Sequence, residues 1–99
     1  MDTDRQLVIV EDDTSFARAL GRSFGRRGYD VRLCQRVGDL KELLETFSPQ
    51  YAVVDLKLVN GSGLECVKQL HEFEPEMKIV VLMGFASIAT AVEAIKLGA

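Results

Sequence analysis

Short apolar runs alternate with amphipathic segments along the chain, and this order restricts the possible folds more than any other feature of the sequence. Runs rich in β-branched residues predict strands at residues 6–10, 29–34, 51–54 and 78–83. The segments that follow them space their apolar residues with a helical period and predict helices at 14–27, 37–47, around 64–70, and 86–97. Such a strand–helix alternation predicts right-handed crossovers and a parallel sheet with helices on both faces.

The predicted strands are apolar over almost their whole length. A sheet with one face in water would need polar residues at alternate positions, which the segments VIV at 8–10 and VVLM at 80–83 lack. A parallel sheet that is buried on both faces fits them better. In open sheets of this kind the ligand site lies outside the carboxyl ends of the strands, so the residues that follow each strand are the first candidates for a site.

The first predicted helix has clear boundaries and an unusual composition. Asp13 or Thr14 can cap its start, and Gly28 fits its end. Gly21 and Gly25 each lower helix stability by roughly 1 kcal/mol relative to Ala, so either a neighbouring segment approaches closely there or the helix simply tolerates them. The core-facing stripe of this helix is expected to comprise Phe16, Leu20, Ser23, Phe24 and Arg27.

Three basic residues are regularly spaced on the same helix. Arg18, Arg22 and Arg26 stand four residues apart. At this spacing each pair of like charges destabilises a helix by about 0.2–0.5 kcal/mol. They form either a solvated face or a docking surface for an acidic partner.

The composition argues against several classes of protein. The net charge of −3 gives no basic footprint for nucleic acid. No apolar run approaches the roughly 20 residues of a membrane span, and the polar, acidic start does not resemble a signal peptide, so a cytoplasmic location is expected. Cys34 and Cys66 are then expected to be buried or half-buried thiols rather than a disulfide.

Acidic residues follow two of the predicted strands at the point where each strand ends. Glu11 and Asp12 come directly after the first strand, and Asp55 follows the third. If these strands are neighbours, the three carboxylates share one cleft, where they would repel one another and shift one another's pKa values. A hard cation such as Mg²⁺, which prefers oxygen ligands, would resolve this conflict, and an outward-facing acid could accept a phosphoryl group. The alternative is an acidic sheet edge without a site.

Three stretches together resemble the receiver domain of two-component response regulators: VIVEDD at 8–13, VVDLKLVNGSGLE at 53–65 and IVVLMGFASIATAVEAIKLGA at 79–99. The third is most similar to regulators of redox and photosynthesis genes. The resemblance implies a flavodoxin-like, doubly wound α/β sheet with strand order 2-1-3-4. It also implies one receiver domain over residues 1–99 that lacks the family's fifth strand and fifth helix.

The resemblance implies a role for each acid. Asp55 would accept the phosphoryl group from the phosphohistidine of a sensor histidine kinase and so control a transcriptional output segment outside this chain. Asp12 would bind Mg²⁺ directly together with Asp55, Glu11 would bind it through water, and Lys57 through its backbone carbonyl. Asp13 would support a helix cap rather than the metal.

Other positions gain expected roles in the same way. Gly61 and Gly63 would let the turn after the third strand pass close to the site. Arg18 and Arg22 lie on the helix with which such domains usually meet their kinase. The family is not enzymatic beyond self-phosphorylation and weak autodephosphorylation.

Two departures from the family bear on function. Where the family ends its fourth strand with Ser or Thr, whose hydroxyl binds the acyl phosphate, this chain has Met83, a switch position whose thioether has no proton to donate. The family's Lys that pairs with the phosphoryl group has no counterpart, since neither Lys57 nor Lys96 matches its position. The alternative to a phosphorylation switch is therefore a degenerate receiver that acts as a phosphorylation-independent interaction or dimerisation module.

Self-association is expected from the same departures. Without a fifth strand and helix, the strand at 78–83 would be an exposed sheet edge, and exposed edges and apolar patches favour pairing. The uncharged run at 86–92 resembles the family's output and dimer surface, for which Ser87, Thr90 and Ala91 are candidates. No nucleic-acid-binding or membrane segment is expected in this chain.

Two other classes fit less well. A phosphohydrolase with an Asp nucleophile usually carries a second acid two residues later, where this chain has Lys57. A flavodoxin-like electron carrier needs a hydroxyl-rich phosphate loop after its first strand, and EDDTS at 11–15 supplies acids that would repel the phosphate. His71 has no nucleophile or metal ligand near it in the sequence and is expected to be a surface residue.

Overall fold

The strands and helices follow the predicted order. The structure, a computed structural model, describes residues 5–56, 63–82 and 96–98. Its elements are β1 (Gln6–Val10), α1 (Thr14–Arg26), β2 (Asp30–Cys34), α2 (Val37–Leu43), β3 (Tyr51–Asp55), α3 (Gly63–Phe73) and β4 (Lys78–Leu82). Met83 and all but the end of the predicted helix at 86–97 lie outside the described residues.

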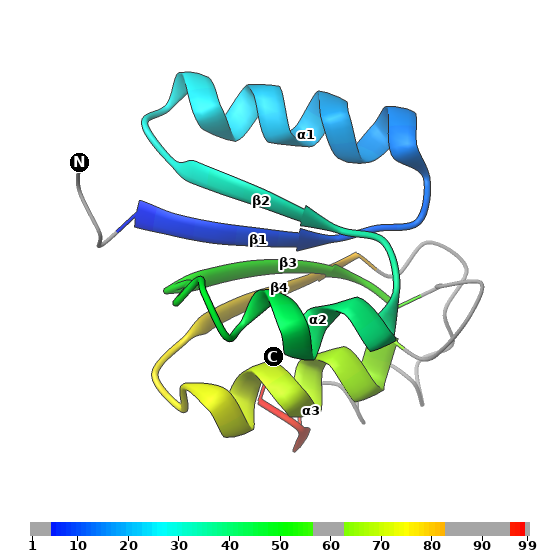
Figure 1. Cartoon of the computed structure of the whole chain (residues 1–99), viewed down its shortest axis with the longest axis vertical. Helices are drawn as coiled ribbons and strands as arrows, with labels where there is room; N and C mark the ends of the chain where they lie inside the picture. The colour runs from blue at the N-terminus through cyan, green and yellow to red at the C-terminus, as the bar shows by residue number, and fades with distance from the viewer. Residues whose placement is uncertain (1–4, 57–62, 83–95, 99) are drawn as a thin grey trace.

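The four strands form one parallel sheet in the order β2-β1-β3-β4. As Figure 1 shows, α1 lies on one side of the sheet, whereas α2 and α3 lie side by side on the other. The register places Val10 of β1 beside Cys34 of β2 and Val54 of β3, so β1 runs through the middle of the sheet with β3 directly next to it. The predicted α/β fold class and strand order are therefore confirmed.

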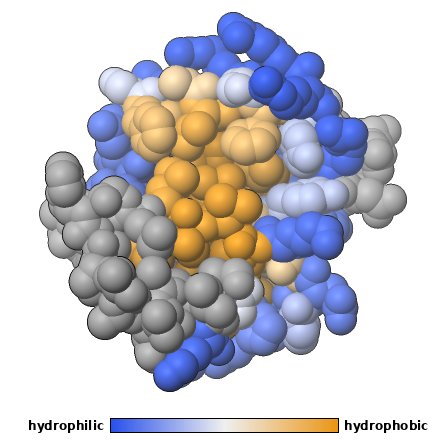
Figure 2. Space-filling model, turned by 180° about the vertical axis from the view of Figure 1, so that it is seen from behind, coloured by the Kyte–Doolittle hydropathy of each residue, from blue (hydrophilic) through white to orange (hydrophobic). Residues whose placement is uncertain are grey.

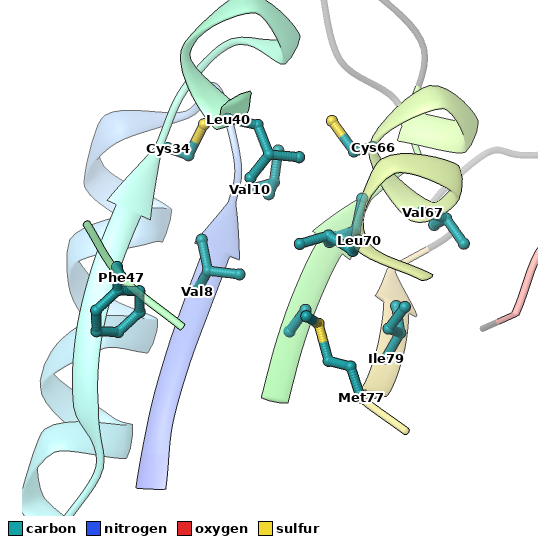
Figure 3. Close-up of a cluster of buried hydrophobic side chains, with 12 residues drawn as sticks. Val8, Val10, Cys34, Leu40, Phe47, Cys66, Val67, Leu70, Met77 and Ile79 are labelled. Atoms are coloured by element: carbon teal, nitrogen blue, oxygen red, sulfur yellow. The ribbon is translucent and has the colours of Figure 1, made fainter. Parts of the chain in front are cut away.

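The larger part of the core lies between the sheet and the pair α2 and α3, and it explains why the strands are so apolar (Figure 3). Leu40 of α2 and Leu70 of α3 are fully buried, and burial of such a side chain contributes about 1.5–3 kcal/mol. The buried members are Val8, Val10, Cys34, Leu40, Phe47, Ala52, Val54, Cys66, Val67, Leu70, Met77 and Ile79. Cys34 and Cys66 are free thiols, as predicted, and burial raises the pKa of Cys66 to about 12.

The capping of α1 is confirmed, but part of its predicted core stripe is wrong. Asp13 is the N-cap, and its side chain accepts a hydrogen bond from the backbone N–H of Phe16 at 3.1 Å. The side chain of Phe16 is 43% exposed, however, and the buried residue is Ala17. Successive helical residues point about 100° apart, so a helix that turns Ala17, Leu20 and Phe24 toward the sheet turns Phe16 away from it.

Arg27 also lies outside the core, for a different reason. The helix ends at Arg26, and the Arg27 guanidinium donates hydrogen bonds back to the backbone carbonyl and the hydroxyl of Ser23, at 2.9 and 2.7 Å. Gly28, with φ of +92°, then turns the chain toward β2, which agrees with the predicted helix end.

The second predicted helix, at 37–47, is confirmed only in its first part. α2 ends at Leu43, and the Glu45 N–H then bonds to the Glu42 carbonyl at 3.1 Å, a tighter spacing than that of an α-helix. Phe47 still reaches the core and is 4% exposed. The apolar spacing was therefore predictive of burial, although it overestimated the length of the helix.

His71, which was expected to be a surface residue, is only partly exposed to solvent. It lies on α3, and its Nδ1 atom is buried with no hydrogen-bond partner among the described residues. Gly98, which has φ of +114°, approaches so closely that a side chain there would come within 2.5 Å of this Nδ1. The contact packs the turn at 96–98 against α3, and the positive φ agrees with the predicted helix stop at Gly98.

The face of the sheet beside α1 is only partly covered. Figure 2 shows an apolar area open to solvent on the side of the molecule that is turned away in Figure 1. Val80 of β4 pairs with Val53 of β3, which faces α1, and Val80 is 58% exposed. Among the described strands, β4 is an edge that pairs only with β3, as expected. None of the described helices is long and apolar enough to cross a membrane.

Candidate functional site

Three carboxylates meet where β1 and β3 end. Val10 and Val54 are partners in the parallel ladder, so the residues that follow them leave the sheet side by side. Glu11, Asp12 and Asp55 each place a carboxylate oxygen within 4.8 Å of the others. The predicted cluster is thus present, and we call these three residues the acidic cluster. A set of three carboxylate oxygens at this spacing can hold a metal ion and suits a hard cation.

Glu11 is the buried member of the acidic cluster. Its side chain is 3% exposed, whereas Asp12 and Asp55 are half-buried. Burial raises the pKa of Glu11 to about 7, helped by the hydrogen bond with Asp55 and the negative charge of Asp55; the backbone N–H of Asp13, 3.4 Å from Oε2, acts in the opposite direction. The cluster therefore retains a proton near neutral pH, and a bound cation would displace it.

The burial of Glu11 follows from strand pairing that the sequence does not display. The Glu11 backbone N–H bonds to the Cys34 carbonyl at 2.9 Å, so the pairing of β1 with β2 continues one residue beyond β1. Glu11 is consequently held at the sheet like a strand residue. The one sequence signal for this is its position immediately after an uninterrupted apolar run.

Gly63 brings the start of α3 against the end of β3. A Cβ atom at Gly63 would lie 2.5 Å from the Asp55 carbonyl oxygen and closer still to the Leu56 Cα. Real Cβ contacts are essentially never shorter than 3.0 Å, so only glycine fits here. The close approach predicted for Gly63 is confirmed, whereas Gly61 lies outside the described residues.

The structure places some of the other predicted residues and leaves several outside its described part. Asp13 is exposed and caps α1 instead of joining the acidic cluster, as expected. Arg18 and Arg22 are exposed on α1. The positions that lie outside the described residues are Lys57, Met83, Ser87, Thr90 and Ala91.

The raised pKa of Glu11 predicts a stability that falls with rising pH. Between the ordinary pKa of 4.5 and about 7, the folded metal-free chain binds more protons than the unfolded chain, so stability is present at low pH and lost as pH rises through 7. The free energy of unfolding in urea with EDTA is expected to drop by roughly 2–3 kcal/mol from this group between pH 5 and 8.

Glu11→Gln should flatten this pH dependence, because an amide cannot ionise. The exposed Glu45→Gln is the matched control and should leave it unchanged. An unaltered slope in Glu11→Gln would show that another group carries the proton.

The chain matches a known protein family over most of its length. The family model of the response regulator receiver domain matches residues 7–99. The chain belongs to the response regulator receiver family. The sheet order β2-β1-β3-β4 and the acids at the ends of β1 and β3 are the parts of this receiver that the resemblance had led us to expect.

The similar curated proteins are regulators. The receiver is 44% identical over 97 residues to the photosynthetic apparatus regulatory protein RegA of Rhodobacter capsulatus, covering 98% of this chain and 53% of RegA. It is 41% identical over 96 residues to the acid tolerance regulatory protein ActR of Rhizobium meliloti, covering 97% of this chain and 50% of ActR. The chain thus spans about half the length of these relatives.

Solved structures show the same fold. A response regulator from Burkholderia pseudomallei, crystallised with a phosphorylated aspartic acid, a calcium ion and citrate, matches with a TM-score of 0.91 and 40% identity over 97% of this chain and 56% of that chain. A CheY-like receiver domain protein from Methanospirillum hungatei matches with a TM-score of 0.89 and 27% identity over 96% of this chain and 76% of its own.

Proposed function

We propose that this receiver accepts a phosphoryl group on the Asp55 carboxylate from the phosphohistidine of a sensor histidine kinase, in a Mg²⁺-dependent reaction. The observation that supports this is the convergence of Glu11, Asp12 and Asp55 within 4.8 Å at the ends of neighbouring strands. The modification would control a transcriptional output segment outside this chain. The domain is then a phosphoryl acceptor in the cytoplasm, with at most self-phosphorylation from small donors and weak autodephosphorylation.

The chain's own residues would divide the work of holding the ion and the phosphoryl group. Asp12 and Asp55 are the proposed direct Mg²⁺ ligands, Glu11 binds through water, and Lys57 contributes its backbone carbonyl. When bound, Mg²⁺ would neutralise the negative charge that gathers at the phosphoryl group. The buried Glu11 would then give up its proton to the solvent, so the cluster carries less negative charge in the metal-free domain than three ionised acids would.

Other residues have proposed roles in contacts and switching. Arg18 and Arg22 on α1 are assigned to kinase docking, and Ser87, Thr90 and Ala91 to an output or dimer surface. Met83 is the proposed switch position. We further propose that the chain represents one receiver domain without its last strand–helix unit, in line with the 76% of the Methanospirillum receiver that it covers.

Labelling with acetyl phosphate tests the proposed function directly. We expect intact-mass spectrometry to show the gain of a single phosphoryl group when the chain is incubated with acetyl phosphate and Mg²⁺, and no gain with EDTA. Beryllofluoride with Mg²⁺, which mimics the bound phosphoryl group, should perturb the amide NMR signals of residues 11–13 and 55–56. A chain that neither gains mass nor responds to Mg²⁺ would contradict the proposal.

Self-association is expected through the uncovered sheet face at β4. The beryllofluoride-activated NtrC4 receiver, 28% identical with a TM-score of 0.82, is a dimer, which supports association as a property open to this fold. Val80→Lys should shift micromolar samples to monomer in light scattering, because the buried apolar contact is worth about 1.5–3 kcal/mol, or roughly 10- to 100-fold in Kd. Phe73→Lys, at a position 41% exposed on α3, is the control; a clean monomer of the unmodified chain would refute the expectation.

A further inference from the structure

A groove lies between α1 and β2, the strand at the sheet edge opposite β4. It has a volume of about 310 Å³ and is lined by Arg18, Gly21, Arg22, Val31 and Leu33. Leu33 is 43% exposed and provides an apolar floor. A larger hollow of about 540 Å³ shares Arg18 and Leu33 with the groove and reaches α2. The groove therefore combines an apolar base with a basic rim.

The arginines of this rim have no acidic partner within the described part of the chain. The one ion pair between described residues joins Arg32 and Asp30 on β2. Arg18 and Arg22 stand one helical turn apart, where like charges repel and destabilise the helix. A carboxylate from another molecule would relieve this repulsion, so the charge of the rim favours an acidic occupant.

The acids near the groove set the direction in which an occupant can lie. Asp39 and Glu42 of α2 also line the larger hollow. They would repel carboxylates placed over α2, while Arg18 and Arg22 attract carboxylates placed over α1. The acidic side of an occupant must therefore face α1.

Gly21 keeps the groove open. A Cβ atom there would meet Leu33 Cδ2 at 3.5 Å and Val31 Cγ1 at 3.7 Å, which are ordinary contact distances. Packing within the chain thus does not require glycine at this position, although glycine weakens a helix relative to alanine. The missing side chain leaves Val31 and Leu33 accessible in the groove that the two arginines also line, and an incoming apolar side chain can reach them.

We infer that the groove between α1 and β2 docks an acidic peptide segment of a partner protein, with an apolar side chain on Leu33 and two carboxylates on Arg18 and Arg22. One helical turn separates the arginines by about 6 Å along the axis, which matches acids four residues apart on a helical partner. The inference goes beyond the proposed function, since docking requires neither a phosphoryl group nor a cation. The groove shares both arginines with the proposed kinase contact, so the acidic segment and the kinase would compete for the same surface. Only this competition rests on the proposed function.

NMR titration of the ¹⁵N-labelled chain with synthetic helical peptides tests the inference. The probe peptides carry two glutamates four residues apart beside Leu, Phe or Ile, and matched peptides carry lysines in place of the glutamates. We expect shifts confined to residues 18–22 and 31–35 with the acidic peptides. Arg18→Glu combined with Arg22→Glu should weaken acidic-peptide binding about tenfold and create binding of the lysine peptides.

Matched variants separate groove binding from general charge effects. Gly21→Met fills the groove and should abolish binding, whereas Gly25→Met, where a Cβ meets nothing within 4 Å, should not. Arg26→Glu, one turn beyond the rim, should leave binding within about twofold, as expected for an exposed charge outside the contact. Asp55→Asn should bind the acidic peptides like the unmodified chain, so a failure of phosphorylation leaves this inference standing.

Three results would overturn the inference. The first is the absence of localised shifts with every acidic peptide, and the second is equal binding of acidic and lysine peptides. The third is self-association that disappears in the Arg18→Glu and Arg22→Glu double variant, because the occupant would then be a second copy, which offers the exposed Phe73 beside Glu72 and Glu74.

Discussion

Asp55→Asn is expected to take up no phosphoryl group from acetyl phosphate under conditions in which the unmodified receiver is labelled. The amide of asparagine is not a nucleophile at neutral pH, and the change also removes a negative charge from a cluster whose oxygens lie within 4.8 Å of one another. Intact-mass spectrometry with Mg²⁺ gives the yield of modified chain. Uptake equal to that of the unmodified chain would place the acceptor at another acid.

Asp13→Asn is the matched control for this substitution. It makes the same chemical change two residues after Glu11, but Asp13 is exposed and serves as the N-cap of α1. Asparagine caps a helix about as well as aspartate. Labelling and stability should therefore stay close to those of the unmodified chain, and loss of labelling in Asp13→Asn would mean that the cap position takes part in the site.

Asp55→Asn should also change the pH dependence of stability, which can be measured without phosphorylation. The hydrogen bond and negative charge of Asp55 help to raise the pKa of Glu11. Removing that charge should let the pKa of Glu11 fall toward its ordinary value, and the loss of stability between pH 5 and 8 should become smaller. The pH dependence of unfolding and the labelling assay thus probe the same contact by independent measurements.

The fold was largely predictable because its determinants are local. The apolar runs are short, uninterrupted and separated by segments of helical period, and in a parallel sheet this pattern admits few arrangements. What local patterns did not decide was which side chain on a helix faces the sheet. Phe16 is larger and more apolar than Ala17, yet the direction of α1 over β1 and β2 buries Ala17.

The acidic cluster was predictable from topology, whereas the deeper burial of Glu11 relative to Asp12 and Asp55 was not. Acids that follow neighbouring parallel strands must meet at one edge, which is sufficient to bring Glu11 and Asp55 together. Glu11 is buried because its backbone pairs with Cys34, a tertiary contact between segments that are distant in sequence. The exposure of Leu33 in the groove beside α1 has the same origin, since it depends on how much of β2 the helix covers.

Gly63→Ala is expected to destabilise the receiver by about 1–3 kcal/mol, the usual cost of forcing extra atoms into a packed region. The added Cβ would lie 2.5 Å from the Asp55 carbonyl oxygen, against a practical minimum of 3.0 Å, and closer still to the Leu56 Cα. Both obstacles are backbone atoms, which cannot rotate away. The end of β3 or the start of α3 must therefore move, and a shift of β3 would displace Asp55. Urea unfolding with EDTA measures this cost.

Because Asp55 belongs to the acidic cluster, the same substitution should also slow labelling by acetyl phosphate. Displacements approaching 1 Å at a reacting group can cost up to roughly a hundredfold in rate, so the rate should fall even under conditions in which the variant is fully folded. Gly38→Ala is the matched control, because a Cβ on α2 at that position meets nothing within 4 Å. That change should be neutral or stabilise the chain by up to about 1 kcal/mol. If Gly63→Ala lost stability but labelled at the normal rate, the contact between α3 and β3 would support the fold without positioning Asp55.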